Sequence, residues 1–169
     1  MTIDPEIVAH AAAVGIGATL LMDAWGLLAA RAFGMPFPDY ALVGRWLCGM
    51  PAGVFRHAGI ARSPRRTGES WVGWLAHYAT GIAYALLLVL IATPRWLDAP
   101  TPWPALALGI ATVAAPFFVM QPAFGLGIAG ARAPSPRQVR LRSVLNHTVF
   151  GLGLFVAAAV IARVLGGDG

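Results

Sequence analysis

The chain has 169 residues, of which 58% are hydrophobic and only 11% are charged. Because soluble domains carry about 25% charged residues, we expect residues 1–169 to form one membrane domain. The net charge of +5 comes from arginines that gather at the ends of apolar runs, where topology and anionic headgroups account for them, so no nucleic-acid partner is expected.

Four apolar runs predict membrane-spanning helices, at about 8–30, 71–92, 104–128 and 141–164. The core of each contains about 20 mostly apolar residues, which matches a hydrocarbon thickness of about 30 Å. None of the runs alternates as a barrel strand would. Since backbone polar groups in lipid must be satisfied internally, we expect an all-α membrane protein with four transmembrane helices in a bundle.

The first run contains the stretch GIGATLLMDAWG, which places Asp23 inside a membrane helix. Gly15, Thr19, Met22, Asp23 and Gly26 share one helix face by their 3–4 spacing, as in a packing stripe. A charged residue near the bilayer centre costs at least about 2.5 kcal/mol, so Asp23 is not expected to face lipid.

An insert of about 36–60 follows the first run and includes YALVGRWLCGMP. This stretch is apolar, with the single Arg45 and the two ring anchors Tyr40 and Trp46. It predicts a short helix lying in the membrane interface within the first cytoplasmic loop.

The second and fourth runs are related by an internal repeat. Residues 61–92 align without gaps on residues 131–162, and the identical pairs include His77 with His147 and Gly81 with Gly151. The chain is therefore expected to form two repeated helical hairpins of like orientation, at about 8–92 and 104–164.

The start of the second helix in each hairpin has its own signal. Ser63-Pro64 and Ser135-Pro136 each place a capping hydroxyl before a proline. This pattern predicts that the two helices begin at Pro64 and Pro136.

The third run contains Pro116 and Pro122, which predict a kink that opens backbone carbonyls to a water or an ion. It ends in GLGIAG at 125–130, which matches the dinucleotide pattern G-x-G-x-x-G. That fingerprint needs a preceding strand and an acid about 20 residues later, so we interpret the stretch as a flexible helix end.

Arginines set the expected orientation. Six lie between the first two runs and four between the third and fourth, whereas the other connection has only Arg95. The positive-inside rule makes both Arg-rich loops cytoplasmic, in contact with anionic headgroups, and places both termini in the periplasm or exterior.

Each predicted helix carries one intramembrane polar residue in its cytoplasmic half. These are expected to converge on the bundle axis as a binding site, with supporting positions around it. The site residues are Asp23, His77, Gln121 and His147, and the supporting ones are Thr19, Asn146, Pro116 and Pro122. The same residues equally suit interhelical hydrogen bonding that only holds the bundle together.

The two histidines also allow a cofactor. His77 and His147 occupy corresponding positions on two helices of like orientation, which suits axial ligands of a haem. Met22 and Met120 add soft ligands for copper beside them. The sequence does not decide between these cofactors and none.

Several stretches carry a family resemblance: GIGATLLMDAWGLL, YALVGRWL, HYATGIAYA, LNHTVFGLGLF and, most specifically, APFFVMQPAFG. Together they cover nearly the whole chain and resemble a bacterial inner-membrane family catalogued as domain of unknown function 2938 (DUF2938). The resemblance implies a four-span protein of the bacterial inner membrane. It does not indicate an activity.

Three functions follow from the residues. The first is a small carrier with an intramembrane polar site, which parallel repeats favour. The second is a haem- or copper-binding protein, and the third is a structural or assembly subunit of a membrane complex. The sequence does not decide the oligomeric state, and a homodimer or a larger membrane complex is compatible with it. An enzyme is least supported, because no nucleophile–base arrangement is recognisable.

Overall fold

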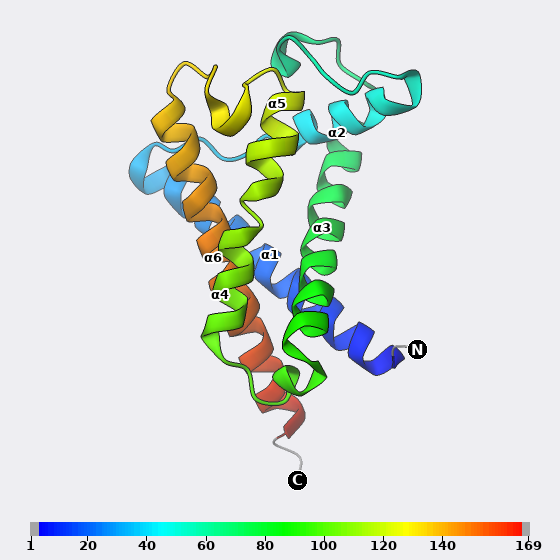
Figure 1. The fold of residues 1–169 in the computed structure, drawn as a ribbon, viewed down its shortest axis with the longest axis vertical. Helices are drawn as coiled ribbons and strands as arrows, with labels where there is room; N and C mark the ends of the chain where they lie inside the picture. Colours follow the sequence, from blue (N-terminus) through cyan, green and yellow to red (C-terminus); the bar gives the residue numbers. More distant parts are fainter. Residues whose placement is uncertain (1–3, 167–169) are drawn as a thin grey trace. The chain divides into compact units, whose positions relative to one another are not determined.

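The computed structural model describes residues 4–166, and side chains as far as residue 164. Within these limits the regular secondary structure is all helical, with loops between the helices and no strand. Figure 1 follows the helices in chain order. They are α1 (Pro5–Phe33), α2 (Tyr40–Gly49), α3 (Glu69–Ala92), α4 (Pro102–Ala111), a π-helical turn (Pro116–Met120), α5 (Gln121–Ala123) and α6 (Pro136–Gly166).

Four segments of the described chain are long and apolar enough to cross a membrane: Pro5–Phe33, Glu69–Ala92, Pro102–Ala123 and Pro136–Val164. Their number and order confirm the prediction of an all-α protein compatible with a multi-pass membrane location. The third segment ends at Ala123, five residues before the expected 128, because the glycine-rich stretch leaves the helix there.

The described chain divides into two compact units, which are considered separately. Unit 1 contains the described parts of residues 1–36, 78–111 and 146–169, and unit 2 contains residues 37–77 and 112–145. Helices α3 and α6 are therefore each divided between the two units, with the first part in unit 2 and the rest in unit 1.

Unit 1 has a core of small and branched side chains. Ala11, Val14 and Ala18 of α1 are buried there with Leu88 of α3 and Leu154 of α6. In lipid, apolar burial gives little driving force between helices, so small residues that permit close van der Waals contact hold such a bundle together. The predicted stripe is confirmed in part, since Gly15, Thr19 and Gly26 are buried.

Two glycine contacts bring helices of unit 1 together. A Cβ built on Gly15 of α1 would lie 2.8 Å from the carbonyl oxygen of Gly81 in α3. A Cβ on Gly109 of α4 would lie 2.5 Å from the Cα atom of Gly151 in α6. Gly81 and Gly151 are paired in the predicted repeat, so both copies use this position for a close crossing; the repeat as a whole stays a prediction.

Unit 2 contains α2, the first part of α3, the π-helical turn, α5 and the first part of α6. Its core is formed by Ile60, Ala123 and Phe124, with Trp46 packed against it. The expected helix of the 36–60 insert is present as α2, which begins after Asp39, whose carboxylate accepts a hydrogen bond from the Ala41 amide.

The helices α2 and α3 cross at two glycines. A Cβ on Gly44 would overlap the carbonyl group of Glu69, and a Cβ on Gly73 would overlap the carbonyl group of Tyr40. Both positions therefore need glycine for the backbones to approach this closely.

The predicted start of α3 at Pro64 is wrong, because the helix begins at Glu69. Ser63 is extended, with ψ of 150°, as expected for a residue that precedes proline. The corresponding prediction at Pro136 is confirmed, since α6 begins there. In the glycine-rich stretch 125–130, Gly125, Gly127 and Gly130 have positive φ, which ends the helix as interpreted.

Candidate functional site

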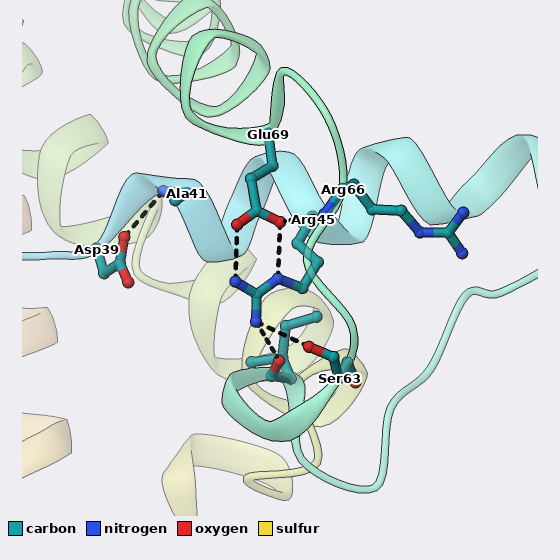
Figure 2. Close-up of polar contacts among 7 residues, drawn as sticks. Asp39, Ala41, Arg45, Ser63, Arg66 and Glu69 are labelled. Atoms are coloured by element: carbon teal, nitrogen blue, oxygen red, sulfur yellow. Dashed lines mark hydrogen bonds and ion pairs between the residues drawn. The ribbon is translucent and has the colours of Figure 1, made fainter.

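The best-defined polar cluster of unit 2 is centred on Arg45 (Figure 2). The Arg45 guanidinium donates two hydrogen bonds to the Glu69 carboxylate, from Nε at 2.8 Å and from Nη2 at 2.7 Å. Its third nitrogen, Nη1, donates to the carbonyl oxygens of Ile60 and Ser63 at 2.9 and 3.2 Å. The backbone amide of Arg66 donates to Glu69 Oε2 at 2.8 Å. This cluster fastens α2, the loop and the start of α3 to one another.

The Arg45–Glu69 pair is buried, with side-chain exposures of 7% and 10%. Hydrogen bonding to Glu69 raises the pKa of the Arg45 guanidinium above its ordinary value. Because the bidentate geometry satisfies both charges, the pair is stable inside, whereas either charge left alone there would be costly.

A second polar pair of unit 2 lies in the same loop. His57 Nδ1 is 2.8 Å from Ser63 Oγ, and His57 Nε2 is buried without a hydrogen-bond partner among residues 4–166. The hydroxyl of Ser63 also lies 3.4 Å from the Gly59 carbonyl oxygen. With no acid bonded to the ring, the pair lacks the third group that orients a catalytic histidine.

The third apolar segment is interrupted inside unit 2. The helix α4 ends at Ala111, and a π-helical turn runs from Pro116 to Met120. Pro116 and Pro122 have no amide hydrogen to donate, so the regular ladder cannot continue there. The predicted kink is therefore present, as a π-helical turn.

Gln121 follows this turn directly and is 3% exposed. Its Nε2 donates to Ser143 Oγ of α6 at 3.1 Å, while its Oε1 has no hydrogen-bond partner in the described chain. Gly130 lies beside Oε1, since a Cβ built on Gly130 would be 3.5 Å from it. The interruption of the third segment is therefore followed directly by a buried hydrogen-bond acceptor, Gln121 Oε1, that has no donor among the described residues.

Asp23 belongs to unit 1, where it is half-buried. Tyr78 of α3 donates a hydrogen bond from its hydroxyl to Asp23 Oδ2 at 3.1 Å. One turn away, Thr19 is 1% exposed and bonds back to the Gly15 carbonyl oxygen at 2.8 Å. A Cβ on Gly81 would overlap Thr19 Oγ1, so Thr19 packs directly against α3.

The two histidines have different surroundings. The ring of His77 stacks on Tyr40 in unit 2, with centroids 3.9 Å apart and planes inclined by 21°. His147 belongs to unit 1 and hydrogen-bonds to the backbone of Gly109 in α4. Asn146, also in unit 1, is half-buried.

The four predicted site residues thus fall in both units: Asp23 and His147 in unit 1, His77 and Gln121 in unit 2. Their convergence on one site stays a prediction. Met22 packs against the core of unit 1 and Met120 against that of unit 2. Among residues 4–166, no three His, Cys, Asp or Glu side chains cluster in a way that could hold a metal ion.

Sequence reasoning missed Glu69, Tyr78 and the buried role of Arg45. A signal for the pair was present, because Glu69 is the only acid between Asp39 and Asp98 and Arg45 is the only charge in its apolar stretch. Two such isolated opposite charges are expected to meet if both are buried. Tyr78 gives no comparable signal, since a tyrosine inside an apolar run carries no charge that requires a partner.

Four apolar segments of spanning length, with polar groups within them and a third segment interrupted beside two prolines, are compatible with the class of multi-pass membrane proteins. More specifically, the chain belongs to the family described as protein of unknown function (DUF2938), whose model matches residues 12–161. Comparisons with curated proteins and with solved structures found no match.

Proposed function

We propose that this protein is a small carrier of the bacterial inner membrane, with an intramembrane polar site that includes Asp23, His77, Gln121 and His147. The observation that carries the proposal is the interrupted third segment with the buried Gln121 at its break. Secondary transporters bind substrates and ions at discontinuous membrane helices, where irregular backbone lines a cavity.

The chemistry of Gln121 supports a ligand at this point. A buried acceptor without a donor costs about 1–3 kcal/mol. Its Oε1 would be satisfied by an N–H or O–H of a small polar ligand, or by water when no ligand is bound. Gly130 lies beside Oε1, and Val139 packs against this glycine, since a Cβ built on it would be 2.7 Å from Val139 Cγ1.

Asp23 supplies the group that can exchange a proton. Its carboxylate lies within an apolar helix and accepts a hydrogen bond from Tyr78. A proton-coupled carrier needs such an ionisable group within its membrane segments.

A structural subunit is the second candidate, and a specific observation favours it. The Asp23–Tyr78 and Gln121–Ser143 bonds each already join two helices, as structural hydrogen bonds would.

The haem or copper alternative with His77 and His147 remains a hypothesis, for which a visible absorbance spectrum of the purified protein is the direct measurement.

The test is proton flux into proteoliposomes that contain a pH-sensitive dye, driven by a potassium diffusion potential. The wild-type protein should acidify the lumen faster than protein-free vesicles do. Asp23→Asn and His77→Ala should remove the flux, and His147→Ala should reduce it less. Asp98→Asn is the matched control, because Asp98 is exposed and outside the four apolar segments.

Melting in detergent separates the two candidates. If wild-type vesicles show no flux and the same substitutions lower the stability by roughly 1–2 kcal/mol per lost bond, the carrier hypothesis fails and the structural one stands.

A further inference from the structure

Charge is divided very unequally between the two units. Unit 2 contains nine arginines and two acidic residues, a formal charge of +7, whereas unit 1 contains three arginines and five acidic residues, a charge of −2. The net positive charge of the protein therefore comes from unit 2 alone.

Most of these arginines have no acidic partner. Arg45 is neutralised by Glu69, and Asp39, the other acid of unit 2, caps α2. Eight arginines remain, none of which forms a salt bridge with an acid among residues 4–166. Seven are exposed and the last is half-buried: Arg56, Arg62, Arg65, Arg66, Arg132, Arg137, Arg140 and Arg142.

These eight arginines lie in two segments, and backbone hydrogen bonds link each segment to the chain around α5. The amides of His57 and Ile60 donate to the carbonyl oxygens of Ala123 and Phe124, at 2.8 and 3.1 Å. The amide of Arg132 donates to the Leu126 carbonyl oxygen at 2.7 Å. Segments 56–66 and 132–142 are thus both held to the chain around α5, and together they form what we call the arginine surface.

Large apolar side chains are interleaved with these arginines. Phe55 precedes Arg56 and is 59% exposed, and Leu141 lies between Arg140 and Arg142 and is 57% exposed. Apolar side chains beside guanidinium groups suit the boundary of a bilayer, where the former enter the acyl region and the latter reach phosphates. A nucleic acid would match the charge and could stack on Phe55, but it would leave Leu141 in water.

We propose that the arginine surface binds the headgroups of anionic phospholipids in the leaflet that it contacts. These arginines supply positive charge for the phosphodiester groups, and within residues 4–166 no salt bridge neutralises them, although Arg140 Nε donates to the Ala129 carbonyl oxygen at 3.0 Å. This proposal is independent of transport, because it concerns unit 2 residues outside the polar site.

The experiment uses the full chain purified in detergent and titrated with phosphatidylglycerol or phosphatidylcholine, with bound lipid measured by native mass spectrometry. The test variant combines Arg62→Gln with Arg137→Gln, one from each segment. The control combines Arg95→Gln with Arg163→Gln, which removes the same charge from unit 1. Circular dichroism and size-exclusion chromatography check that both variants are folded.

The wild-type protein should prefer phosphatidylglycerol, and added salt should weaken that preference. Since an arginine near an anionic surface contributes about fivefold to binding, the test variant should bind phosphatidylglycerol roughly 10- to 30-fold more weakly and the control nearly unchanged. Equal binding of the two lipids, or equal weakening in both variants, would overturn the proposal. So would tighter binding of a single-stranded oligonucleotide, which would assign the surface to nucleic acid.

Discussion

The Arg45–Glu69 pair allows a quantitative prediction for Glu69→Gln. Glutamine has nearly the same shape but lacks the charge, and its amide nitrogen cannot accept a hydrogen bond. If its oxygen replaces Oε2, the bonds from Arg45 Nε and from the Arg66 amide persist, and the 2.7 Å bond from Arg45 Nη2 is lost. A hydrogen bond between charged groups contributes about 1.5–3 kcal/mol.

The uncompensated guanidinium adds to this loss, because arginine stays charged and its pKa is raised further by Glu69 in the native protein. Breaking a buried pair by removing one partner costs about 3–5 kcal/mol, and the two surviving bonds place Glu69→Gln at the lower end, about 3 kcal/mol. For a chain of this size that corresponds to roughly 6–12 °C in melting temperature.

The assay is thermal unfolding in detergent, followed by circular dichroism, for the two single variants Glu69→Gln and Arg45→Met and for the double variant Arg45→Met/Glu69→Gln. Asp39→Asn is the control, since asparagine caps α2 equally well and should change stability by less than about 0.5 kcal/mol. The double variant should recover much of the loss, because no charge is then left buried. A Glu69→Gln variant as stable as the control, or a double variant whose loss equals the sum of the single losses, would refute the reasoning.

Three further predictions follow from the close contacts and the charges. Gly44→Ala should destabilise the α2–α3 crossing by about 2 kcal/mol or more in the same melting assay, whereas Gly59→Ala should be tolerated, because its Cβ would meet only the flexible end of Arg62. Tyr78→Phe should lower stability by roughly 0.6–1.5 kcal/mol, the value of one interhelical hydrogen bond in a membrane; no change would mean that water replaces the hydroxyl. A reporter fused after Gly169, which lies outside the described residues, should be active only in a periplasm-specific form, and cytoplasmic activity would reverse the expected orientation.

The fold was predictable where one physical requirement dominates. Apolar length determines the four segments, and the proline pair marks the break in the third, because a missing amide hydrogen disrupts a helix in any context. The π form of that break was not predictable, since the choice of hydrogen-bond register depends on side chains packed from other helices. The predicted start of α3 was wrong for a similar reason, because the Ser63 hydroxyl bonds to His57 and to the Gly59 carbonyl oxygen instead of capping a helix.

The polar residues were predictable as types but not as partners. The sequence identified Asp23 and Gln121 because each interrupts an apolar run, and depth along the helix suggested that they share one site. That shared site stays a prediction, whereas the bonds to the Tyr78 and Ser143 hydroxyls had no signal in the sequence. Pairing depends on helix rotation and crossing angle, which the glycine contacts set and which spacing alone does not encode.

The chain has only seven acidic residues, and the role of Asp23 can be compared with the roles of the others. Among the acids within the described residues, Asp4 and Asp39 accept hydrogen bonds from backbone amides at helix starts, and Glu69 neutralises Arg45. These three are accounted for by backbone capping or by charge pairing. Asp23 instead lies in mid-helix, where its Oδ2 accepts a hydrogen bond from the Tyr78 hydroxyl. An ionisable group inside an apolar helix is a candidate for function, so the comparison of flux and melting in Asp23→Asn bears most directly on what this protein does.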